Sequence, residues 1–196
     1  MSGVVIAGDT SGSVALNAPA VAGTNTLTLV AETGTLAPLV SGTAVTAPAG
    51  ATIDFTGIPS WAKRITVMVS GVSFTASSYP VLRLGTSAGV VSTGYLGASQ
   101  FITNSGIAGV SNATAGGFGF YDNSSSSSDL QHGAVILSLL GSNIWTATGV
   151  ITRSNTITTC WQSGSIALAG TLDRVQLTTL AGTATLDAGS INIMYE

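Results

Sequence analysis

Residues able to do acid–base or nucleophilic chemistry are scarce in this chain, which has one histidine, His132, and one cysteine, Cys160. His132 follows Asp129 and the serine run 124–128, so one short segment holds the residue types of a Ser-His-Asp triad. Neighbours in one loop seldom form a rigid triad, and no G-x-S-x-G turn leads into a helix here. We therefore expect His132 to bond to nearby backbone, Cys160 to pack as a small apolar side chain, and the chain not to be an enzyme.

Metal and carboxylate chemistry have equally weak support. A zinc site needs more His or Cys ligands than the chain has, and Asp122, Asn123 and Asp129 lack the spacing of a calcium-binding EF-hand. Glycan hydrolysis uses two paired carboxylates. The eight acidic residues form no close pair along the sequence: Asp9, Glu32, Asp54, Asp122, Asp129, Asp173, Asp187 and Glu196. We expect no metal and no cofactor, with a calcium site and glycan cleavage as minor alternatives.

Glycan binding without cleavage is a stronger alternative, because aromatic rings stack on sugar rings. The candidate contacts are Trp61, Trp145 and Tyr121. Trp61 and Trp145 each follow a turn signal, which could place them at the end of a β-sandwich. Packing in a core or in a subunit interface is the more frequent role of such residues.

Low charge is the most unusual feature of the composition. Charged residues make up 7% of the chain, against roughly 25% in soluble globular domains. Such a surface repels other copies weakly and so favours self-association. The net charge of −3 leaves no basic stripe for nucleic acid, and no apolar run reaches the ~18 residues of a membrane span. We expect neither nucleic acid nor a membrane as a partner. The N-terminus lacks a signal-peptide pattern, so we expect synthesis in the cytoplasm.

The sequence after residue 45 predicts an all-β domain. Within residues 63–70, Ile65, Val67 and Val69 alternate with Thr66, Met68 and Ser70, the pattern of a strand with one buried face. Polar segments 104–117 and 124–128 predict surface loops. Strands are expected at 52–55, 64–74, 80–84, 90–96, 118–121, 134–140, 145–152, 156–168, 173–180 and 190–195. They indicate an antiparallel β-sandwich over residues 46–196, with a jelly roll as the leading topology.

Residues 1–45 differ from the rest, with no aromatic residue and only two charged ones. Their apolar residues follow the spacing of half-buried strands, but they are too few to make a core. We expect an extended N-terminal arm that assembles with companion chains or attaches to another protein. The residues expected to carry this assembly are Val14, Leu16, Leu27, Leu29 and Leu36.

Three motifs lie in this arm: GDTSG at 8–12, APAVAGTNTLTL at 18–29 and TGTL at 33–36. Together they resemble the N-terminal segment that recurs in tail-fibre and related virion proteins of tailed bacteriophages. Residues 55–59, 63–67 and 187–196 are similar to the domain that follows this segment in such proteins.

The resemblance implies a homotrimeric structural component of the virion and carries over no catalytic residue. The arm would bind other tail or capsid proteins, and the sandwich would face outward, where it could contact glycan on the host surface. Typical fibres are several times longer, so a short tail fibre competes with a head fibre or capsid decoration protein. A lectin-like glycan-binding module is the alternative from another functional class.

Overall fold

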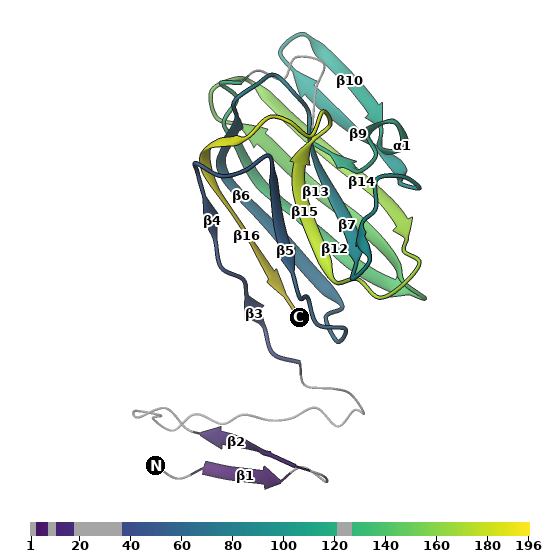
Figure 1. The fold of residues 1–196 in the computed structure, drawn as a ribbon. Coiled ribbons are helices and arrows are strands. Elements are labelled where there is room, and N and C mark those ends of the chain that lie inside the picture. The colour runs from purple at the N-terminus through teal and green to yellow at the C-terminus, as the bar shows by residue number, and fades with distance from the viewer. Residues whose placement is uncertain (1–2, 8–10, 18–36, 121–126) are drawn as a thin grey trace. The chain divides into compact units, whose positions relative to one another are not determined.

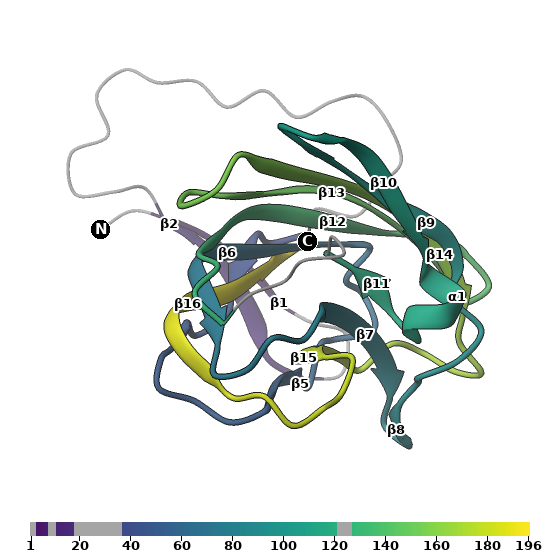
Figure 2. The same ribbon diagram turned by 90° about the horizontal axis from the view of Figure 1, so that it is seen from above.

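The computed structural model describes residues 3–7, 11–17, 37–120 and 127–196. The chain divides into two units, Met1–Leu36 and Ala37–Glu196. In the first unit, β1 (Gly3–Ala7) and β2 (Ser13–Asn17) form an antiparallel hairpin. The second unit contains two antiparallel sheets that face each other, which confirms the expected all-β sandwich (Figures 1 and 2). No described helix is long and apolar enough to cross a membrane.

The larger sheet has nine strands, and its centre is the meander of β12, β13 and β14. Along the sheet the order is β10 (Gly106–Ser111), β9 (Leu96–Thr103), β14 (Thr158–Ala167), β13 (Ile144–Arg153), β12 (Gln131–Gly141), β6 (Arg64–Phe74), β16 (Leu186–Tyr195) and β3 (Val40–Ser41). The ninth strand, β4 (Val45–Thr46), also pairs with β16.

The smaller sheet has five strands. Its order is β11 (Phe118–Gly119), β7 (Pro80–Thr86), β15 (Arg174–Thr179) and β5 (Thr52–Thr56), and β8 (Gly89–Val90) pairs with β7. The structure supports the sandwich, while the jelly-roll connectivity stays a prediction.

Alternation of apolar and polar residues decides which side of each strand is buried. Ile65 and Val67 of β6 are almost completely buried, as are Val135 and Leu137 of β12. The intervening side chain of Ile136 is 40% exposed, so it lies on the outer side of the sheet. Strand β12 lies between β13 and β6, as expected of its apolar sequence.

The least accurate sequence prediction concerns residues 90–117. A strand was expected at 90–96 and a loop at 104–117, but the structure has the hairpin β9–β10 followed by the short helix α1 (Asn112–Ala115). The hairpin consists mainly of Gly, Ala, Ser and Thr, with Ile102 and Ile107 exposed. Its apolar periodicity is therefore too weak to separate it from a loop.

The sandwich unit begins at Ala37, earlier than the expected start at residue 46. Strand β3 pairs Val40 with Tyr195, and β4 pairs Val45 with Ile191. The last part of the expected arm thus completes the edge of its own chain's larger sheet. Of the residues expected to carry assembly, Val14 and Leu16 lie in β2, whereas Leu27, Leu29 and Leu36 lie outside the described residues.

Candidate functional site

His132 is held by hydrogen bonds on both ring nitrogens. The backbone N–H of Gly71 donates to its Nδ1 at 3.1 Å, and its Nε2 lies 3.1 Å from Ser154 Oγ. An Nδ1 that accepts a hydrogen bond places the proton of the neutral ring on Nε2. The ring then donates to Ser154 and has no lone pair there to accept the serine proton, so this Ser–His pair is a structural contact.

The described carboxylates are separated from one another by their partners. Asp54 accepts a 2.9 Å hydrogen bond from Gln176, Asp187 accepts one from Ser73, and Asp173 pairs with Arg174. Glu196 forms an ion pair with Arg64, which is the first residue of β6. Strand β6 lies inside the sheet between β12 and β16.

The serine-containing motif does not have the geometry of a nucleophile turn. The G-x-S-x-G sequence at 85–89 makes the turn between β7 and β8, not a strand-to-helix turn. Asp122 and Asn123 lie outside the described residues, and among those described no group of three acidic, His or Cys residues could hold a metal ion.

The three aromatic residues considered for glycan contact have different positions. Trp145 is 3% exposed and belongs to the core, so its ring faces are covered by apolar neighbours. Trp61 is 39% exposed, and its ring centroid lies 5.7 Å from that of Tyr195. Tyr121 lies outside the described residues. The core packing that is the more frequent role applies to Trp145.

The outer side of the larger sheet carries the Arg64–Glu196 pair at β6, but its other half is free of charge. Across the five adjacent strands β10, β9, β14, β13 and β12 the one charged residue is Arg153, and its side chain points inward and is 6% exposed. We call the outer side of these five strands the uncharged face. Its exposed apolar side chains include Leu96, Ile102, Ile107, Ile136, Val150 and Trp161.

Strand register gathers part of this apolar surface at the middle of the uncharged face. Trp161 of β14 is directly opposite Val150 of β13, which is opposite Ala134 of β12. Trp161 is 43% exposed and Val150 46% exposed. Directly opposed side chains on one side of a sheet lie within about 5 Å, so these residues form one continuous apolar strip.

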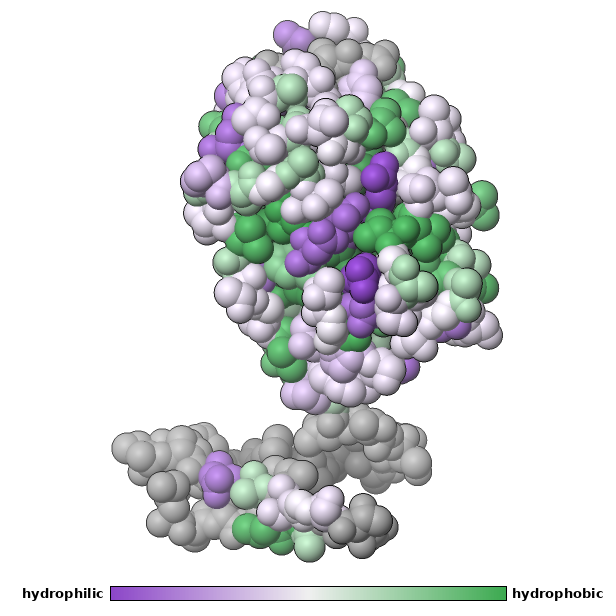
Figure 3. Space-filling model, viewed as in Figure 1, coloured by the Kyte–Doolittle hydropathy of each residue, from purple (hydrophilic) through white to green (hydrophobic). Residues whose placement is uncertain are grey.

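The outer side of the smaller sheet is different. Arg83 of β7, Gln176 of β15 and Asp54 of β5 are direct cross-strand neighbours, and Arg174 lies beside this row. In Figure 3, which views the molecule from this side, strongly hydrophilic residues form a band between apolar areas. Among the described residues, the outer side of the smaller sheet therefore carries charged groups, whereas the uncharged face carries none.

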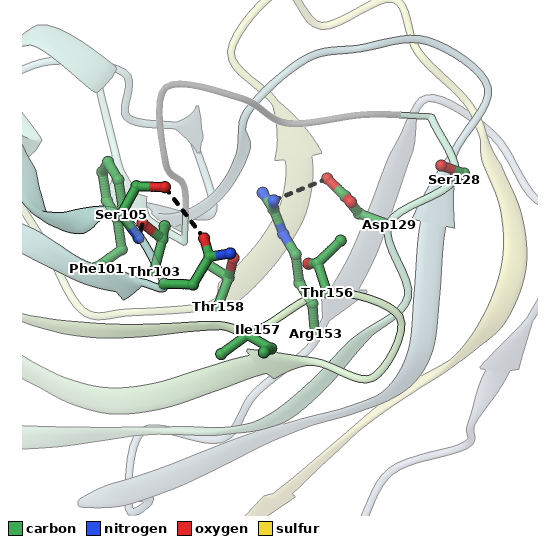
Figure 4. A pocket seen from close by; sticks show the side chains of 10 residues that line it. Phe101, Thr103, Ser105, Ser128, Asp129, Arg153, Thr156, Ile157 and Thr158 are labelled. Atoms are coloured by element: carbon green, nitrogen blue, oxygen red, sulfur yellow. Dashed lines mark hydrogen bonds and ion pairs between the residues drawn. The ribbon is translucent and has the colours of Figure 1, made fainter.

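A cavity of about 750 Å³ lies at the end of the larger sheet where β9, β12, β13 and β14 meet. Arg153 Nη1 contacts Asp129 Oδ2 at 3.1 Å, and both side chains are at least nine-tenths buried. Figure 4 shows this pair between Phe101, Thr103 and Ser105 on one side and Ser128 on the other. Hydroxyl and amide groups supply most of the remaining lining, together with the exposed Ile157.

No known protein-family model, curated protein or solved structure matches this chain.

The cavity and the uncharged face were both missed as sites in the sequence. Asp129 was considered for a calcium site, a triad and glycan cleavage, and nothing in the sequence singles out Arg153 as a site residue. Residues 129 and 153 become neighbours because β12 and β13 form a hairpin that pairs Gln131 with Arg153. The available signal was the scarcity of charge after residue 87, where only Asp122, Asp129, Arg153, Asp173, Arg174, Asp187 and Glu196 are charged.

Proposed function

We propose that this chain is a non-enzymatic structural subunit that assembles with copies of itself through the uncharged face. The observation that carries the proposal is the contrast in charge between the uncharged face and the outer side of the smaller sheet. The smaller sheet presents Arg83, Arg174 and Asp54 to its surroundings, whereas five adjacent strands of the larger sheet present no acidic, Lys or Arg side chain.

A second copy is the occupant that best fits the uncharged face. Contiguous exposed apolar surface is uncommon on monomeric proteins and marks an interaction site. Interface cores are depleted of charged residues and enriched in aromatic ones, which matches the strip of Trp161, Val150 and Ala134. The face has no net charge for an oppositely charged partner to recognise, so copies of one chain can approach it without repulsion.

We propose a bacteriophage virion as the setting of this assembly, as the N-terminal motifs imply. A short trimeric tail fibre is the first choice, and a head fibre or capsid decoration protein the second. The separation of Met1–Leu36 from the sandwich unit supports an attachment segment distinct from the body. Mass spectrometry of purified particles of the phage that encodes the chain would detect it, and particles without it would contradict this setting.

The assembly is tested by sedimentation of the full chain, whose subunit mass is 19.4 kDa. We expect a homotrimer, and dissociation toward the monomer when Val150 is changed to Lys, because a buried ammonium would then lack a partner. Val150 is half exposed in the single chain, so the lysine does not disturb its core.

The matched control is Thr52→Lys, which adds the same charge to an exposed position of β5 on the smaller sheet. This variant should keep the wild-type mass. A monomeric wild type, or a Val150→Lys variant with an unchanged mass, would contradict assembly through the uncharged face.

A further inference from the structure

The cavity at the end of the larger sheet has an unusual floor. Gln131, Arg153, Thr158 and Thr103 lie side by side on β12, β13, β14 and β9 and point to the inner side of the sheet. The next row along the same strands contains Ile151, Cys160 and Phe101, which belong to the apolar interior. On β13, β14 and β9 the inner side of the sheet therefore changes from apolar to polar at the same level.

Stability alone does not account for this polar row. A buried ion pair such as Arg153–Asp129 is seldom more stabilising than apolar residues of similar volume, because both charges lose hydration. Buried hydroxyl and amide groups also cost free energy unless they are bonded. A polar floor beneath an open cavity is, by contrast, typical of a ligand site.

The chemistry of the lining restricts the class of ligand. Arg153 and Asp129 neutralise each other, so the cavity offers neither a free cation for an anionic ligand nor a free carboxylate for a cationic one. Thr103, Asn104, Ser105, Thr156 and Thr158 line it with groups that both donate and accept hydrogen bonds. This combination suits a neutral ligand that carries many hydroxyl groups.

The volume of the cavity and its apolar residue Ile157 agree with a neutral ligand that carries many hydroxyl groups. Its volume of about 750 Å³ lies within the ~300–1,000 Å³ typical of small-molecule sites. Ile157 is 78% exposed at its edge and offers an aliphatic surface to the C–H side of a sugar ring. Asn104 and Ser105 form the turn between β9 and β10, so two side chains lie where that hairpin borders the cavity.

We propose that this cavity binds a neutral sugar residue of a glycan, with the sugar hydroxyls bonded to Asn104, Thr156 and the Arg153–Asp129 pair and the ring resting on Ile157. The site does not depend on the proposed self-association. It also differs from the described aromatic contacts that the sequence suggested, since neither Trp61 nor Trp145 lines it.

Saturation-transfer NMR on the full chain tests this proposal with the methyl glycosides of glucose, galactose, mannose and N-acetylglucosamine as probes. We expect at least one probe to receive magnetisation. The double variant Asn104→Ala/Thr156→Val should bind that probe about fivefold or more weakly, because two hydrogen bonds to its hydroxyls are lost. Both positions are in turns at the surface, so the fold is retained.

Thr56→Val is the matched control, because it removes a hydroxyl from an exposed position of β5 and should leave binding unchanged. Absence of transfer to all four glycosides, or equal binding by wild type and the double variant, would overturn the proposal. Sedimentation of the double variant separates the two ideas: an unchanged mass with lost sugar binding shows that the cavity acts independently of assembly.

Discussion

At the scale of single residues, the polar groups inside the sandwich are the most informative. Tyr95 is fully buried, its Oη accepts a 2.7 Å hydrogen bond from the Leu84 N–H, and it donates to the Val91 carbonyl at 3.0 Å. Its ring meets Phe118 edge-on, with centroids 5.0 Å apart. This tyrosine thus fixes the connection between β8 and β9 to the core.

Burial makes Tyr95 sensitive to alkaline pH. Loss of hydration, only partly offset by the Leu84 hydrogen bond and the charge of Arg83, raises the pKa of Tyr95 to about 12. The folded chain holds this proton more tightly than the unfolded chain, so the stabilisation is complete below pH ~10 and is lost as pH rises toward 12. Two pKa units correspond to roughly 3 kcal/mol.

We therefore predict that the free energy of unfolding falls more steeply for wild type than for Tyr95→Phe between pH 9 and about 11.5. Urea unfolding at a series of pH values measures it. At neutral pH the variant should be less stable, since the Leu84 N–H loses its partner. Parallel pH curves for the two proteins would contradict the assigned pKa.

At the scale of elements, the sequence reveals strands in which apolar and polar residues alternate strongly. It does not reveal where the backbones of two strands approach each other closely. The strands β6 and β12 were expected because Ile65, Val67, Val135 and Leu137 recur at a period of two. The pairing of β9 with β14 left no such trace. It places Gly97 directly opposite Gly164, where the two backbones approach so closely that only glycine fits.

Gly164 gives this pairing a direct test. A Cβ added at Gly164 would lie 2.2 Å from the Leu96 carbonyl oxygen and 2.7 Å from Asn112 Nδ2. We predict that Gly164→Ala lowers the free energy of unfolding by roughly 1–3 kcal/mol, because backbone must move. Gly50→Ala is the control, since its nearest neighbour would lie at 3.6 Å, and it should change stability little in urea unfolding.

If Gly164→Ala proved as stable as the control, the close approach of β9 and β14 would be wrong.

The candidate sites were hidden from the sequence for the same reason as this pairing. Arg153, Thr158 and Thr103 are scattered along the chain, and only the order β12–β13–β14–β9 makes them a row. Composition showed that charge is scarce but not which side of the sandwich lacks it.

At the scale of the whole sandwich, the account depends on what covers the uncharged face. The last part of the expected arm, residues 37–45, pairs through β3 and the start of β4 with its own chain's sheet and so does not need a companion. We therefore expect the chains to assemble through the surface centred on Trp161 and Val150, and not through residues 37–45. The outer side of the smaller sheet, with Arg83 and Asp54, stays in contact with solvent in such an assembly.

Two tryptophans of similar exposure allow a direct measurement of this claim on the unmodified protein. In the single chain Trp61 is 39% exposed and Trp161 43% exposed, whereas the buried Trp145 serves as an internal reference. Hydroxyl-radical oxidation followed by peptide mass spectrometry measures all three in one sample. Coverage of the uncharged face predicts that Trp161 is oxidised several-fold more slowly than Trp61, approaching Trp145. Equal oxidation of Trp161 and Trp61 would contradict it.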